Sequence, residues 1–415
     1  MTPLRRNRDF VLLQLGQGLS TLGSTSTYVA YPLLVLALTH SPAKAGVVGF
    51  ANVLPYPLFA LLAGVVADRV DRKRLMIGMD LVRAAAMASV VGALAAGVLT
   101  FWQVAIVAFV EGSAFVFFNI AEVGALRSVV PGRQLPAAAA AEQSRYAAVT
   151  LAGPSLGGAL FGIGRSLPFL ADAVSYAFSI VSLLWMRTPF QETRERDTAP
   201  LREQIREGVA WLWANAYLRT SALIFACGNF AFSGIYLVFV VLSKRHGFSS
   251  AEIGGLIAIF GAASLTGSLL APWISKRLSM RAIMVGNGWL NAALIACAIA
   301  PGPYLLLACV LPAALLSPAL NAVVVGYRTA ITPDHLVGRV SSVARNLAQL
   351  ASPLGPLVAG LLLAAFTART TLLVLGGLAV LIAAWTTLSP SIRNAPSLAE
   401  LDEPPTLPAS PEGAG

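Results

Sequence analysis

The sequence predicts an all-α polytopic membrane protein in which twelve transmembrane helices form two pseudo-symmetric halves of six. Three observations predict this fold class: the composition, the apolar segments and an internal repeat. Of the 415 residues, 57% are hydrophobic and only 12% are charged, whereas a soluble domain carries about 25% charged residues. So little charge cannot cover a soluble globule, and so apolar a composition also excludes a disordered chain.

The apolar residues are gathered in segments of about 20, long enough to cross the roughly 30 Å hydrocarbon core as helices. The segments lack the alternating pattern of a membrane β-barrel. Three arginines (Arg5, Arg6 and Arg8) precede the first segment, but no small-residue cleavage site follows it, so we expect an uncleaved helix rather than a signal peptide. The predicted spans are 10–37, 45–67, 75–98, 102–126, 140–163, 167–187, 219–242, 252–274, 282–300, 303–327, 340–365 and 370–389.

The Lys and Arg residues lie mostly on one side of the predicted bundle, which we call the basic side. It comprises the N-terminus, the loops that follow the even-numbered spans, and the C-terminus. Because cytoplasmic loops are enriched in Lys and Arg, we expect both termini in the cytoplasm and the protein in the cell membrane. The net charge of +10 is thereby explained by topology, and we expect no nucleic-acid partner.

An internal repeat relates the two halves. We expect a first half at 1–187, a cytoplasmic linker at 188–218 with an amphipathic helix from 201, a second half at 219–390, and a disordered tail at 391–415. Two related six-helix halves are a common plan of secondary transporters. One constant shift along the chain superimposes Asn119 on Asn321, Pro131 on Pro333, Gly153-Pro154 on Gly355-Pro356, and Gly158 on Gly360.

The loop after the second span carries a candidate gate. A glycine one turn before an aspartate allows close helix approach, and the aspartate could then face a helix N-terminus or an arginine and hold one conformation closed. The alternative is that the basic residues only mark topology. The candidate gating residues are Gly64, Asp68, Arg69, Arg72, Lys73 and Arg74.

This loop resembles the signature loop of the major facilitator superfamily. Further stretches resemble its branch of macrolide-efflux and enterobactin-exporter-like proteins, and the resemblance implies secondary transport through a central pathway. Many relatives carry an acidic residue shortly after the Leu-Gly of helix 1, where this chain reads Gly23-Ser24-Thr25-Ser26, so the resemblance supplies no proton site there. The matching stretches include Arg8-Asp9-Phe10, Gly16-Gln17, Leu54-Pro55, Asp80-Leu-Val-Arg83, Asp172-Ala-Val-Ser-Tyr176 and Glu207-Gly208.

The fifth predicted span contains a glycine–proline motif. Proline removes a backbone donor and bends the helix, while glycines permit close packing, so a kinked packing helix is one interpretation. The motif also resembles one associated with antiporters in the superfamily, which favours export over import. Its residues are Gly153, Pro154, Gly157 and Gly158.

Ionisable residues inside predicted spans are the strongest indication of a site, because a charge in the membrane is costly unless it faces a cavity or a partner. Glu111, Asn119 and Glu122 fall on one face of the fourth span. Glu111, the deepest, is the first candidate for proton coupling, and a structural ion pair is the alternative. Asp172, Glu122 and Glu142 are further candidates, although Glu142 and Arg145 could form a local salt bridge and Asp172 could simply pack.

We therefore expect a proton-driven exporter of a small amphipathic or hydrophobic molecule, working as a monomer in the lipid bilayer. Proton-coupled import and a non-transporting sensor are the alternatives. The sequence lacks a phosphate-binding loop for ATP and a metal-ligand pattern, so we expect no cofactor, no metal and no enzyme activity. The candidate residues of the substrate pathway are Gln14, Gln17, Asn119, Arg345, Asn346 and Gln349.

Overall fold

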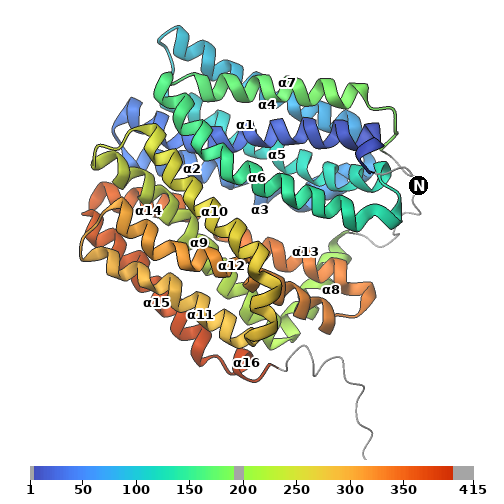
Figure 1. The fold of residues 1–415 in the computed structure, drawn as a ribbon, viewed down its shortest axis with the longest axis vertical. Coiled ribbons are helices and arrows are strands. Elements are labelled where there is room, and N and C mark those ends of the chain that lie inside the picture. Colours follow the sequence, from blue (N-terminus) through green and yellow to red (C-terminus); the bar gives the residue numbers. More distant parts are fainter. Residues whose placement is uncertain (1–3, 191–200, 396–415) are drawn as a thin grey trace, which may run out of the picture.

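Helices α1 to α7 form one half of the molecule and α9 to α15 the other, drawn above and below each other in Figure 1. The computed structural model describes residues 4–190 and 201–395, and within these ranges every regular element is helical. The predicted tail therefore lies mostly outside the described residues. The N-terminus and α8 lie at the same side of the bundle, the basic side.

The helices have the following bounds: α1 Arg8–Thr39, α2 Pro42–Val53, α3 Pro55–Arg69, α4 Arg72–Ala95, α5 Phe101–Val129, α6 Leu135–Ile163, α7 Leu167–Trp185, α8 Leu201–Ala214, α9 Ala216–Arg245, α10 Ser250–Arg277, α11 Met280–Ala292, α12 Pro303–Ile331, α13 Asp334–Leu350, α14 Leu354–Ala365, α15 Ala368–Leu388 and α16 Pro390–Arg393. Short 3₁₀ turns, η1 (Leu4–Arg6), η2 (Gly132–Gln134) and η3 (Ala293–Ala298), complete the chain. Helices α2 and α3 form one span that is interrupted at Leu54, before Pro55, and α13 and α14 form another.

Eleven of the twelve predicted spans are confirmed as helices long and apolar enough to cross a membrane. The prediction of one continuous helix over 282–300 was wrong, because α11 ends at Ala292 and continues as the tighter turns of η3. The side-chain amide of Asn291 donates to the carbonyl of Asn287, the acceptor that the α-helix itself uses at this point. Such side-chain bonds compete with regular helix geometry.

The linker helix α8 packs against α13 and α9 of the second half. Leu212 is fully buried there, Gly208 lies against the backbone of Arg339, and Glu207 forms an ion pair with Arg339. Val209 and Trp213, which helical spacing places on the same apolar face as Leu212, are exposed. The helix is therefore docked on the second half along only part of its predicted apolar surface.

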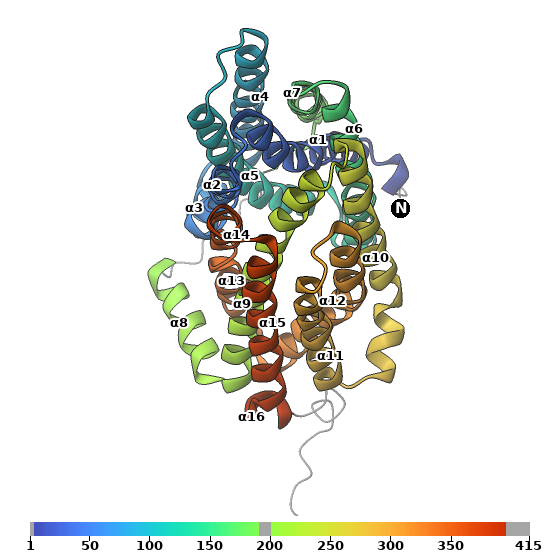
Figure 2. The same ribbon diagram turned by 90° about the vertical axis from the view of Figure 1, so that its left-hand side faces the viewer.

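The two halves meet mainly on the side opposite the basic side, through two helix crossings. Helix α2 crosses α14, and α6 crosses α10; both pairs lie side by side in Figure 2. Each crossing is built on a pair of glycines, Gly46 with Gly360 and Gly158 with Gly254. A Cβ added to Gly158 would lie 3.0 Å from the Cα of Gly254, so only glycine allows the backbones to approach so closely.

The α6–α10 crossing gives a first testable prediction. Gly254→Val is expected to reduce transport by about tenfold or more, because the new side chain meets backbone that cannot rotate away, and such overpacking shifts a two-state equilibrium. Gly255→Val is the matched control, since a Cβ there has nothing within 4 Å. Transport rates at equal expression provide the measurement, and wild-type transport by Gly254→Val would contradict the prediction.

Candidate functional site

A cavity of about 670 Å³ lies between the two halves and is lined by both of them. Its wall is largely aromatic and apolar, with few polar groups, as is usual for a site that accepts small molecules. Among the residues that line this cavity, Glu111 is the one with a carboxyl group. The aromatic residues of the wall include Tyr28, Tyr56, Phe115, Tyr146, Phe232, Tyr236 and Phe260.

Behind the wall, Arg83 of α4 lies at the centre of a buried charged cluster. Its side chain is 2% exposed, and its Nη1 lies 3.3 Å from Oδ1 of Asp80, one helical turn away. Its Nη2 donates to the Ser24 hydroxyl at 2.8 Å and lies 3.6 Å from Oε1 of Glu111. The guanidinium also stacks on the ring of Tyr176, 4.1 Å from its centroid. Such pairing and stacking stabilise a cation away from water.

Glu111 of α5 connects this cluster to the cavity. Its Oε2 accepts a hydrogen bond of 2.7 Å from Nδ2 of Asn52, and its Oε1 accepts one of 3.4 Å from the Tyr176 hydroxyl. Arg83 also lies beside Oε1. The Glu111 carboxyl therefore lines the cavity and takes part in an ion pair at the same time. Glu111 is therefore the residue that connects the cavity to Arg83.

Tyr176 links Glu111 to a third carboxyl, that of Asp172. The Tyr176 hydroxyl lies 3.2 Å from Oδ2 of Asp172, which is fully buried on α7. Asp80 and Glu111 thus share a single guanidinium, and Tyr176 connects Asp172 to this group. The acids of α9 to α15 are all at helix starts, so this buried charge belongs to the first half of the described chain.

Glu122 and Arg145 form a second ion pair, nearer the basic side. Nη2 of Arg145 on α6 lies 2.9 Å from Oε1 of Glu122 on α5, and both side chains are largely buried. Glu142 lies one turn before Arg145 on α6, and Asn119 is half-buried one turn before Glu122. The structure therefore separates Glu111 from Glu122 into two clusters, although the sequence places them on one helical face.

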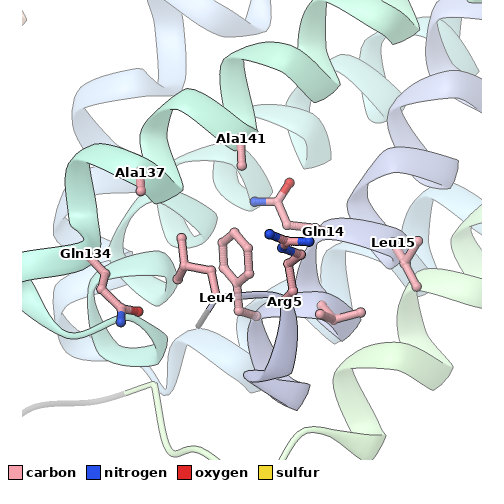
Figure 3. Close-up of a pocket in the computed structure, with 9 residues that line it drawn as sticks. Leu4, Arg5, Gln14, Leu15, Gln134, Ala137 and Ala141 are labelled. Atoms are coloured by element: carbon pink, nitrogen blue, oxygen red, sulfur yellow. The ribbon is translucent and has the colours of Figure 1, made fainter. Parts of the chain in front are cut away.

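The predicted pathway residues of α1 lie in different surroundings. Gln14 lines a second hollow, of about 570 Å³, between the start of α1 and the start of α6 (Figure 3). Helical spacing places Gln14 on the same face as Thr21 and Thr25, which line the central cavity, so the hollow extends that face toward the basic side. Gln17 is buried and donates to Ser179 of α7, away from both hollows.

In the second half, the predicted pathway residues lie on α13. Gln349 lines the central cavity beside Ser352. Asn346 is half-buried and Arg345 is exposed, and neither belongs to the cavity wall. Of the three, Gln349 is therefore the one that the structure places at the cavity.

The loop between α3 and α4 holds the end of α7. Lys73 donates to the carbonyl of Met186 and Arg72 to that of Phe190. Asp68, near the end of α3, is exposed and pairs at 3.2 Å with Arg72, the first residue of α4, while Arg69 and Arg74 are exposed. The close helix approach expected at Gly64 is absent, because a Cβ there would meet nothing within 4 Å. A gating role for this loop stays a prediction.

The glycine–proline motif of α6 has the packing role that the sequence suggested. Gly153 and Gly157 lie against Thr25 and Ser26 of α1, and Gly158 faces α10. Pro154 lies inside the helix and also lines the cavity. The motif therefore joins the cavity wall to the crossing between the halves.

Sequence reasoning missed Asp80, Arg83 and Asn52 as site residues. Asp80 and Arg83 were recognised only as part of a resemblance, although opposite charges three residues apart in an apolar span indicate a buried pair. Asn52 gave no comparable signal, since a neutral amide in a helix carries little cost. Among the described residues, no group of three or more His, Cys, Asp or Glu side chains is arranged to hold a metal ion.

Comparison with known proteins identifies the family. The model of the Major Facilitator Superfamily matches residues 13–306 and 222–411. The chain belongs to this superfamily. It is therefore a multi-pass membrane transporter rather than an enzyme, and the predicted fold class and family are confirmed.

The curated relatives that this chain resembles include efflux proteins. It is 28% identical over 391 residues to the multidrug efflux pump Tap of Mycolicibacterium fortuitum, covering 90% of this chain and 93% of the relative. It is 26% identical over 365 residues to macrolide efflux protein A of Streptococcus pyogenes, covering 85% and 88%. The resemblance to the macrolide-efflux branch is thus confirmed.

Solved structures show the same fold. An inward-facing, unoccupied bacterial homolog of the human lysosomal transporter Spinster matches with a TM-score of 0.74 at 16% identity, covering 94% of this chain and 97% of that one. The nucleoside transporter NupG matches with a TM-score of 0.68 at 14% identity, covering 94% and 100%.

Proposed function

We propose that this transporter exports a small amphipathic or hydrophobic molecule from the cytoplasm by proton antiport with alternating access. The relatives named as multidrug and macrolide efflux proteins support the direction of transport. The aromatic cavity between the halves supports the substrate class, since such walls suit flat or apolar molecules. The pathway lies within one chain, so we also propose that the monomer is the transporting unit.

One observation supports proton coupling above the others: Glu111 reaches the cavity while it shares Arg83 with Asp80 and is connected through Tyr176 to Asp172. If Asp80, Glu111 and Asp172 were all ionised, two negative charges would remain unbalanced in a buried site, which costs several kcal/mol. A proton bound to one of the three carboxyls removes part of this cost. Glu111 is the member of the cluster that a substrate or water can reach. Tyr176 offers a path for that proton to Asp172.

The contacts between the halves support alternating access. In this structure the α2–α14 and α6–α10 crossings close the side opposite the basic side. The Spinster homolog that shares the fold is inward-facing. We propose that the basic side faces the cytoplasm, and that substrate enters there past Gln14 and the second hollow. The halves would then rock about the central cavity to release substrate outside.

The proposal is tested by transport in cells and in everted membrane vesicles. Cells that express the protein should accumulate several-fold less of a cationic dye or macrolide than cells without it, and a protonophore should restore accumulation. In everted vesicles with an acidic lumen, addition of substrate should drive protons out. Increased uptake of a solute in the same cells would overturn export, and efflux without proton movement would overturn antiport.

A further inference from the structure

Asn52 joins the second span to the charged cluster at the point where that span is interrupted. It is the next-to-last residue of α2, just before the break at Leu54. Its Nδ2 donates to Oε2 of Glu111 at 2.7 Å and to the carbonyl of Ala108 at 3.3 Å. The contact with α5 is close, because a Cβ on Gly112 would collide with the carbonyl of Asn52. One amide group thus holds α2 to α5 by two hydrogen bonds.

The two hydrogen bonds depend on the protonation of Glu111. The Ala108 carbonyl only accepts, so the amide nitrogen must face it, and its second hydrogen requires an acceptor at Oε2 of Glu111. Oε1 already faces two donors, Arg83 and the Tyr176 hydroxyl, so a proton bound by Glu111 is placed on Oε2, where it makes this oxygen a poorer acceptor for the Asn52 amide. Rotation of the amide would restore that bond but set Oδ1 of Asn52 against the Ala108 carbonyl, acceptor against acceptor. Protonation at this oxygen therefore weakens one of the two links.

The same short helix forms one of the crossings that close the bundle. Gly46 and Gly49 of α2 lie against Pro356 and Gly360 of α14. Gly46 and Asn52 are six residues apart, or about 9 Å along the helix axis. Helix α2 therefore carries the crossing near one end and the bond to Glu111 near the other. A change at Asn52 reaches the crossing through a single rigid element.

We propose that Asn52 is the positioning residue that couples the protonation of Glu111 to the α2–α14 crossing. With Glu111 ionised and the cavity empty, Asn52 holds α2 in place and the side opposite the basic side stays closed. A proton at Glu111 releases α2 and allows that side to open. A substrate that replaces Asn52 as the partner of the carboxylate has the same effect. This arrangement would prevent the empty, unprotonated transporter from changing conformation.

The inference rests on the proposed role of Glu111 as the proton-exchanging group. Charged and titratable residues from several helices lie around the Glu111 carboxyl. The measured pH response will therefore include their effects on its protonation. These residues are Asp80 and Arg83 of α4, Asp172 and Tyr176 of α7, Tyr31 of α1, and, on the cavity wall, Tyr56 of α3.

Pulsed electron paramagnetic resonance tests the inference without a substrate. Spin labels at Lys44→Cys on α2 and Ala365→Cys on α14, both exposed, would report the separation across the crossing in full-length protein in lipid nanodiscs, with Cys227, Cys297 and Cys309 replaced. From mildly alkaline to mildly acidic pH, the wild-type open fraction should rise about tenfold. In Asn52→Ala, the open fraction should already be high at alkaline pH and change less than about twofold.

Asn229→Ala is the matched control, because Asn229 lines the same cavity and donates to the carbonyl of Ala348, but bonds no carboxylate. It should keep the wild-type pH response. The shorter side chain of Asn52→Ser cannot reach both acceptors, so this variant should also lose the pH response. If Asn52→Ala does not fold, Asn52→Ser provides the test of the role of Asn52. A wild-type response in the folded Asn52 variants, with the response lost in Glu111→Gln, would overturn the role of Asn52 alone. A wild-type response in Glu111→Gln would instead overturn the proposed proton site.

Discussion

Replacement of Arg83 by glutamine is expected to abolish transport and to lower the yield of folded protein, the largest effect of any single substitution considered for this chain. Arg83 is the cation that Asp80 and Glu111 share, and its ring contact with Tyr176 places it next to Asp172. Removal of one partner from a buried pair leaves an uncompensated charge and typically costs about 3–5 kcal/mol. Arg83→Lys should retain more folded protein, because it keeps the charge but loses the planar fork.

The measurement is the monodisperse fraction and melting temperature of the purified variant, together with its transport at equal expression. Arg165→Gln, in an exposed loop on the opposite side, is the control and should behave as wild type. A double variant, Arg83→Gln with Glu111→Gln, should recover part of the lost stability, since one unpaired carboxylate is removed. A stable, active Arg83→Gln protein would show that the cluster does not depend on its cation.

Glu111→Gln is expected to fold and bind substrate, yet to lose proton-driven transport. Glutamine keeps the shape of the side chain and its capacity for hydrogen bonds, but it cannot exchange a proton. The pH dependence of transport should therefore flatten, while substrate binding at fixed pH changes little. Substrate binding and substrate-driven proton release in proteoliposomes distinguish the two steps.

Glu122→Gln is the comparison for this variant, because Glu122 lies on the same helix as Glu111 and also forms a buried ion pair, with Arg145 of α6. That substitution should lower stability by leaving Arg145 without its carboxylate, and should retain the pH dependence of the remaining transport. A stable Glu111→Gln protein with wild-type proton coupling would move the proton site to Asp172, Glu122 or Glu142.

The fold could be predicted from the sequence because apolar length is a strong constraint in a membrane. A run of about 20 apolar residues has few alternatives to a spanning helix. The segment 282–300 met this criterion, but its local geometry depended on Asn291 and on Gly376 of α15, which brings another backbone against Ile295. Contacts of this kind arise between distant parts of the chain, so a pattern within one segment does not reveal them.

The site could be predicted only in part, for a related reason. Glu111 was identified because an acid deep in an apolar span is costly wherever it points. Gln14 and Gln17 are nearly one turn apart and looked equivalent, yet one lines a hollow and the other bonds to α7. The rotation of a helix about its axis decides such cases, and a uniformly apolar helix provides little pattern from which to infer it.

The pair formed by Asp80 and Arg83 lies within a single helix, and this bears on how the protein enters the membrane. A charged residue at the centre of a span costs about 2.5–3.5 kcal/mol during insertion. Because these two side chains are one turn apart, they can neutralise each other within α4, without a partner from another helix. Glu111 and Asp172 arrive later in synthesis, on α5 and α7, and find a guanidinium already in the bilayer. In this cluster, the order of the helices along the chain thus places the cation in the membrane before Glu111 and Asp172 are inserted.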